Sequence, residues 1–233
     1  MVTVSGLLAV TQRLLPANEH GEVRLALDVR WWSFLAACGF DGVPMPLDPV
    51  AAAKLLWRTG CRGLVLTGGN DLGAAPERDA LERYLLRRAL ERGLPVIGVC
   101  RGMQLVLDAF GARLRRVRGH VAVEHRVTGP RGGRTVNSYH DWAVLQAPPE
   151  FAVTARCGPV VEAIRHRSLP LAGIMWHPER TDPVHDEDVD LFSEVFGGRN
   201  AGGDPGRGTR IPDGRGDRRP AEVPRRTGGP HAA

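Results

Sequence analysis

Residues 95–111 read PVIGVCRGMQLVLDAFG, and this stretch decides the fold class. It opens with a short apolar run that is typical of a buried strand and continues into a helical pattern. A strand that passes directly into a helix is a unit of α/β architecture. Cys100 stands at the junction, with Gly98 and Gly102 two positions away on either side.

The position of Cys100 favours a chemical role for its thiol. A tight strand-to-helix turn pushes the side chain at its apex outward, at the carboxyl edge of the sheet where open α/β folds bind ligands. Small flanking residues let the strand and helix backbones approach closely, and helix-terminal amides favour a thiolate. We therefore expect Cys100 to be a nucleophile. The alternative is that it packs in the interior, as most free cysteines do.

The rest of the chain also alternates between apolar runs and helical patterns, which indicates a mainly parallel sheet covered by helices. Core strands are expected at 6–11, 43–47, 63–69, 95–99 and 171–176, and further helices at 27–39, 49–60, 76–93 and 186–197. Between about 113 and 166 the segments become shorter and predict an antiparallel edge. Its expected strands are 121–127, 143–147, 151–157 and 160–166.

Length and composition fit one soluble globular domain over residues 1–197. Residues 198–233 are rich in Gly, Pro and Arg with almost no apolar side chains, so we expect a disordered tail. No apolar run is long enough to span a membrane, and the N-terminus lacks a basic leader, which favours the cytoplasm.

The net charge of +5 gives little support to nucleic-acid binding by the domain. Residues 199–233 hold eight Arg and four acidic residues, so this segment alone carries +4. The four cysteines are irregularly spaced and form no C-x-x-C pair, so neither a disulfide framework nor a zinc site is expected from them.

A cysteine nucleophile needs a base, and the base needs an acceptor that orients it. His177 directly follows the apolar run 171–176, and Glu179 lies two residues further on, where it can accept from the imidazole. In LTGGND the glycine pair ends a buried strand and leaves backbone amides open. The amides of Gly69 and Arg101 are therefore candidates for stabilising an oxyanion. The alternatives are that the glycine pair only forms a turn and that His177 is a structural histidine without a catalytic role.

Together these pieces resemble the class I glutamine amidotransferase-like superfamily, in which a G-x-C-x-G-x-Q elbow precedes a distant H-x-E. Here GVCRGMQ and HPE stand 77 residues apart, counted from Cys100 to His177. The resemblance covers about residues 6–197. It implies a flavodoxin-like three-layer α/β sandwich with a mainly parallel central sheet, a Cys100–His177–Glu179 triad and a γ-glutamyl thioester intermediate.

Within the superfamily, LTGGNDL, VNSYHDWAV and GIMWHPER are most similar to the γ-glutamyl-γ-aminobutyrate hydrolase group, also called peptidase C26, and among these to γ-glutamyl-CDP-amidate hydrolases. The resemblance implies that Gln104 helps to hold the γ-glutamyl group. It further implies that Asn137, Ser138, Tyr139 and His140 cover the amino-acid end of that group, although a structural loop role for His140 is left open. Asn70 and Asp71 could face the leaving group or form a plain turn.

The expected activity is hydrolysis of a γ-glutamyl amide in a small conjugate, without a cofactor and with no metal at the site. One rival is a glutaminase subunit that supplies ammonia to a separate synthetase. Another is a non-catalytic binding module that retains the elbow. The expected partner is a small γ-glutamyl molecule, with no specific nucleic acid or membrane; a homo-oligomer is left open.

Overall fold

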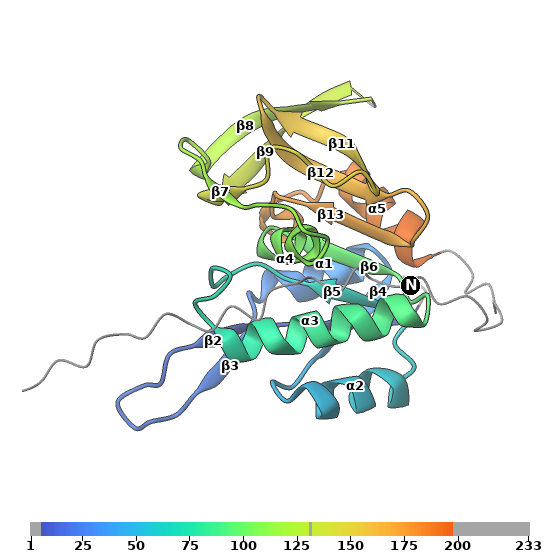
Figure 1. The fold of residues 1–233 in the computed structure, drawn as a ribbon. Coiled ribbons are helices and arrows are strands. Elements are labelled where there is room, and N and C mark those ends of the chain that lie inside the picture. Colours follow the sequence, from blue (N-terminus) through green and yellow to red (C-terminus); the bar gives the residue numbers. More distant parts are fainter. Residues whose placement is uncertain (1–5, 131, 198–233) are drawn as a thin grey trace, which may run out of the picture.

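The computed structural model of the protein describes residues 6–130 and 132–197, so the expected tail lies outside the described residues. Its centre is a nine-stranded sheet in the order β4-β1-β5-β6-β13-β12-β11-β8-β9 (Figure 1). The parallel half consists of β4 (Phe40–Pro44), β1 (Gly6–Val10), β5 (Gly63–Leu66), β6 (Val96–Val99) and β13 (Leu171–Ile174). The antiparallel half consists of β12 (Val160–His166), β11 (Phe151–Cys157), β8 (Val121–Gly129) and β9 (Gly132–Tyr139).

Helices cover both faces of the sheet, which confirms the three-layer α/β sandwich. On one face α2 (Pro49–Arg58), α3 (Pro76–Glu91) and α4 (Arg101–Ala109) contribute to one buried apolar cluster. On the other face α1 (Arg30–Ala37) and α5 (Asp186–Phe196) contribute to a second. Alternating residues of the buried strands join opposite clusters, as the pleat requires: Leu64 and Leu66 face the first and Val65 faces the second.

Most predicted elements are confirmed, and local chemistry explains their limits. The helix expected after Asp48 begins at Pro49 because the Asp48 carboxylate accepts the Ala51 amide at 2.6 Å. The strand expected at 43–47 lies earlier, as β4. Among the residues described, no helix combines the length and apolarity needed to cross a membrane.

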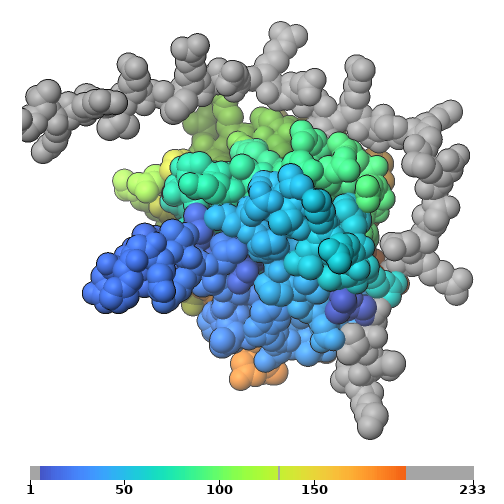
Figure 2. Space-filling view, turned by 90° about the horizontal axis from the view of Figure 1, so that it is seen from below, coloured from blue at the N-terminus to red at the C-terminus, as the bar shows by residue number. Residues whose placement is uncertain are grey.

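Two hairpins were not predicted from the sequence. β2 (Arg13–Leu15) pairs with β3 (Arg24–Ala26), and this hairpin projects from the body of the molecule (Figures 1 and 2). β9 completes a hairpin with β8. The strand expected at 143–147 is wrong in extent, since only β10 (Trp142–Ala143) forms, and it pairs with β7 (Arg115–Arg116).

Sheet order brings three loops together. β6 lies between β5 and β13, and all three run parallel. Their carboxyl ends therefore meet at one edge, where the chain continues into the glycine pair after β5, Cys100 after β6 and His177 after β13. The short 3-10 helix η1 (Pro178–Arg180) follows His177 and carries Glu179.

Candidate active site

Cys100 occupies a sharp turn between β6 and α4. Its backbone has φ 52° and ψ −108°, a conformation that L-residues rarely adopt. The Cys100 amide donates to the Ile174 carbonyl at 2.7 Å, which ties the turn to β13. A Cβ on Gly98 would lie 2.6 Å from the Met103 nitrogen, and one on Gly102 would overlap the Leu66 carbonyl oxygen. Both glycines are therefore required by close backbone approach.

His177 and Glu179 form a buried pair beside the thiol. The imidazole Nδ1 lies 2.7 Å from Glu179 Oε1, a distance that fixes Nδ1–H as donor and leaves Nε2 for another partner. The Cys100 side chain lies nearby, since a Cβ placed on Gly68 would meet His177 Nε2 at 3.4 Å and Cys100 Cβ at 3.5 Å. All three residues are buried, with Cys100 6% exposed.

The surroundings of the His177 ring determine its charge. Burial lowers the pKa of the imidazole, but the Cys100 sulfur and the Glu179 carboxylate favour the charged ring and together raise this pKa from 6.5 to about 9. At neutral pH the ring therefore carries a proton that it can give to a departing group.

β9 and the residue that follows it point alternate side chains to opposite sides, and this separates the predicted substrate segment 137–140 into two pairs. Asn137 donates to the His177 carbonyl at 2.8 Å and accepts from the His177 amide at 2.9 Å, so it fixes the main chain of that residue. The Tyr139 ring packs edge-on against the imidazole, with centroids 5.8 Å apart. The side chains of Ser138 and His140 instead contact the carbonyls of His120 and Trp142.

Gln104 and the loop after β5 have clear structural partners. The Gln104 amide donates to the Trp142 carbonyl at 2.8 Å. Asn70 exchanges two hydrogen bonds with the Leu14 backbone, both 2.9 Å, and so anchors the β2–β3 hairpin. Gly69 has φ 84°, which favours glycine at that position. Asp71 is exposed.

Arg78 holds the loop after β5 from behind, and sequence reasoning missed it. Its buried guanidinium donates to the carbonyls of Thr67 at 2.9 Å and Gly68 at 3.0 Å, and also to that of Gly69. Arg78 therefore fixes the orientation of the peptide groups in this loop, while the Thr67 amide donates to Thr11 Oγ1 at 3.1 Å.

A buried ion network in turn holds Arg78. Arg78 Nε lies 2.9 Å from Glu82 Oε1, and Arg101 pairs with both Glu82 and Asp79. Arg101 was predicted for its amide alone, whereas the structure shows that its side chain joins the elbow to α3.

A cavity of about 320 Å³ adjoins these groups. Gly68, His177 and Glu179 line it on the sheet side, and Arg13 of the hairpin and Arg180 of η1 add two cations. Arg13 lies close over the loop, since a Cβ on Gly69 would meet the Arg13 Cβ at 3.1 Å. The volume suits a small organic molecule, and the two guanidinium groups suit an anionic part of it.

This geometry can be compared with known proteins. A model of the family "Glutamine amidotransferase class-I" matches residues 35–194. The chain belongs to this family. The matched region of this class I glutamine amidotransferase runs from within α1 into α5, so it includes Cys100, His177 and Glu179.

The relatives of this class I glutamine amidotransferase include both a hydrolase and a subunit of a synthase. A γ-glutamyl-CDP-amidate hydrolase of Campylobacter jejuni is 25% identical over 81% of this chain and 96% of the relative. A glutamine-hydrolysing GMP synthase subunit from Thermococcus kodakarensis is 30% identical over 72% of this chain and 92% of the relative.

A solved structure supports the fold. The crystal structure of a Thermoplasma acidophilum protein, described as a putative GMP synthase subunit, superposes with a TM-score of 0.63. It covers 82% of this chain and 92% of its own, at 20% identity.

Proposed function

We propose that the protein is a cysteine-dependent hydrolase that cleaves the γ-glutamyl amide bond of a small conjugate and releases glutamate. The observation that carries the proposal is the buried His177–Glu179 pair with Cys100 close by, at the edge where β5, β6 and β13 end. Family membership gives amidohydrolase chemistry, and similarity to the Campylobacter jejuni hydrolase along 96% of that protein favours a conjugate over free glutamine.

The reaction would proceed through an acyl-enzyme. The Cys100 thiolate attacks the γ-carbonyl carbon, and the amides of Gly69 and Arg101 stabilise the oxyanion. The C–N bond breaks as His177 gives its proton to the departing nitrogen, leaving a thioester. His177 then takes a proton from the water that attacks the thioester carbonyl, and this restores the charged imidazole. The tetrahedral intermediate collapses, the C–S bond breaks to restore the Cys100 thiolate, and glutamate leaves with the water oxygen in its new γ-carboxyl group. Glu179 keeps the ring oriented throughout.

A glutamate-release assay with the purified full chain tests the proposal. The substrates are γ-glutamyl-γ-aminobutyrate, a γ-glutamyl nucleotide phosphoramidate and glutamine, and the Cys100→Ser variant is the blank. We expect at least one conjugate to give a kcat/KM about a hundredfold or more above that of glutamine, because interactions with the leaving group add to transition-state binding. Equal or faster hydrolysis of glutamine contradicts the conjugate as substrate.

The similarity to a GMP synthase subunit favours one second candidate, a glutaminase that serves a synthetase. In that case glutamine hydrolysis by the chain alone is slow and rises sharply when the partner synthetase is added. No glutamate from any substrate, with or without a partner, indicates the non-catalytic module.

The raised pKa of His177 sets the expected pH dependence. Activity needs the charged imidazole, so kcat/KM should fall as pH rises through about 9, the pKa of His177. The Glu179→Gln variant removes an interaction that raises this pKa, and its alkaline limb should move to lower pH. An alkaline limb that does not move contradicts the assignment of the limb to His177.

The same ionisation contributes to stability. Because the folded pKa of His177 lies above the unfolded value of 6.5, its contribution is complete below pH 6.5 and is lost as pH rises through about 9. Urea unfolding at about pH 6 and about pH 9.5 of the native chain and of His177→Ala should therefore show a larger loss with pH in the native chain.

Arg13 is expected to recognise an anionic leaving group. Arg13→Ala should raise KM about tenfold for a phosphoramidate conjugate and leave KM for glutamine within about twofold, since a charged hydrogen bond is worth about 1.5–3 kcal/mol. Arg24 on the partner strand of the hairpin is exposed and pairs with Glu22, so Arg24→Ala is the matched control. Equal effects of the two variants would count against a role for Arg13 in specificity.

A further inference from the structure

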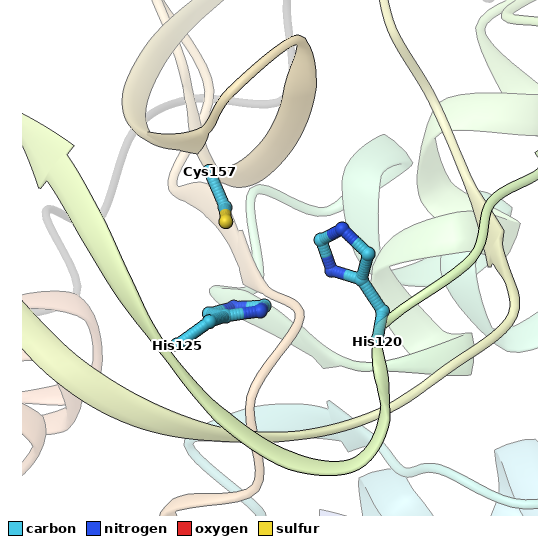
Figure 3. Close-up of side chains that lie close together, drawn as sticks. All are labelled: His120, His125 and Cys157. Carbon is cyan, nitrogen blue, oxygen red and sulfur yellow. The ribbon is translucent and has the colours of Figure 1, made fainter.

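A second cluster of titratable side chains lies in the antiparallel half of the sheet. His120 precedes β8, His125 lies within it and His140 follows β9, while Glu162 comes from β12 and Cys157 ends β11. Figure 3 shows the two imidazole rings of His120 and His125, with the Cys157 sulfur pointing toward them. None of the chemistry proposed for Cys100 uses this cluster.

Glu162 is completely buried at 0% exposed, and neither carboxylate oxygen has a hydrogen-bond partner among the described residues. His140 Nε2 and His120 Nδ1 are likewise buried without a hydrogen bond in the part of the chain that the structure describes. A carboxylate without hydrogen-bond partners in the interior costs several kcal/mol, so this arrangement favours either a bound cation or a shared proton.

The ligand atoms of His120, His140 and Glu162 all lie within 4.8 Å of one another, a spacing that one metal ion could bridge, and His125 is close to the Glu162 member of this group. Glu162 Oε1 lies 3.3 Å from His120 Nδ1, and 3.5 Å from both His125 Nε2 and His140 Nε2. These contacts are longer than charged hydrogen bonds, which measure about 2.7–2.9 Å. Four ligands at about 2.0–2.1 Å from a tetrahedral zinc ion are about 3.3–3.4 Å from one another.

One imidazole is already oriented for coordination. His140 Nδ1 lies 3.2 Å from the Trp142 carbonyl, to which it donates as N–H, and this leaves the Nε2 lone pair directed at Glu162. Metal-bound histidines commonly have such a backbone carbonyl on the other ring nitrogen.

We propose that His120, His140 and Glu162 bind one structural zinc ion, and that His125, whose Nε2 lies 3.5 Å from Glu162 Oε1, turns toward the ion as the fourth ligand. Three imidazoles and a carboxylate are a donor set that suits zinc, whose double charge would balance the buried Glu162. The ion would tie the β8–β9 hairpin to β12, and β9 carries Asn137, which fixes the main chain of His177. This inference does not depend on the proposed hydrolase activity.

The test uses the full chain produced with zinc and without a polyhistidine tag. Mass spectrometry of the metal content should give about one zinc per chain, and His125→Ala and Glu162→Gln should lower this content at least about tenfold. His20 is exposed on the hairpin loop, so His20→Ala is the matched control and should keep its zinc.

Two measurements on the native chain avoid dependence on the folding of variants. Adding zinc to chelator-treated protein at about a hundredfold excess over Kd should raise the melting temperature by about 5–10 °C. Cobalt substitution should give the intense visible bands of tetrahedral coordination.

Three outcomes would overturn the proposal. In the first, the protein contains no metal and its melting temperature does not respond to zinc or cobalt. The histidines and Glu162 would then only share protons with one another. Retention of zinc by both ligand variants would place the metal elsewhere. A sulfur-to-cobalt charge-transfer band that disappears in Cys157→Ser would put the thiolate in the ligand set in place of Glu162.

Discussion

Replacing Cys100 with alanine is expected to abolish glutamate release, with kcat lowered by about ten-thousandfold or more. Alanine removes the atom that forms the thioester, and no neighbouring group can replace it in the acyl transfer. It leaves the backbone cost at φ 52° unchanged, because alanine and cysteine meet the same restriction. The fold should therefore be retained, which circular dichroism and thermal unfolding will check.

Cys38→Ala is the matched control, since Cys38 is buried between the end of α1 and the start of β4, at the opposite edge of the parallel strands from the elbow. It should keep activity. A glutamine-like electrophile should add one label to the native chain, on Cys100. Label found chiefly on Cys38, Cys61 or Cys157, or turnover by Cys100→Ala, would remove the mechanism.

Arg78→Met is expected to lower kcat about a hundredfold and to destabilise the protein by about 3 kcal/mol. The activity falls because the carbonyls of residues 67–69 lose the donor that orients their loop, so that the oxyanion amides move out of position. The stability falls because Glu82 keeps only one of its two cationic partners in a buried site. Urea unfolding and glutamate-release kinetics measure the two effects.

Arg83→Met is the control, since Arg83 is exposed on the same helix and pairs with Asp108 at the surface; it should change stability by about 0.5 kcal/mol or less. The double variant Arg78→Met with Glu82→Gln separates the two roles. Removing the excess charge should recover part of the stability, while kcat stays low because nothing holds the carbonyls. If kcat recovers along with stability, Arg78 contributes only to stability and does not position the oxyanion amides.

Much of the candidate site could be predicted because its key residues are identified by neighbours close to them in the sequence. The turn at Cys100 follows from Gly98 and Gly102, and the Glu179 contact follows from its distance of two residues from His177. Arg78 was missed because an arginine and a glutamate four residues apart on an amphipathic helix indicate an exposed pair. Only the tertiary packing of α3 against the loop after β5 shows that this pair is buried.

The fold could be predicted where periodicity was strong and not where pairing was remote. The helix from Pro49 and the strands 151–157 and 160–166 have clear local patterns, and all three are confirmed. β9 begins with two glycines and includes Asn137 and Ser138, which have low strand propensity. β9 forms because it pairs with β8 along its whole length, although several of its own residues have low strand propensity. His120 and His125 were overlooked, and His140 was predicted only as a substrate contact, for the same reason: their ring nitrogens meet only after the strands of this half of the sheet are paired.

The backbone of Cys100 has a consequence for any effort to make the protein more heat-resistant. Glycine would relieve a conformation that costs roughly 1–3 kcal/mol, so folding and chemistry favour different residues at position 100. A library selected for melting temperature alone would become enriched in glycine at position 100 and yield proteins that are more stable but inactive. Activity must therefore be measured in every round of selection, because a gain in stability at this position indicates that the nucleophilic thiol has been replaced.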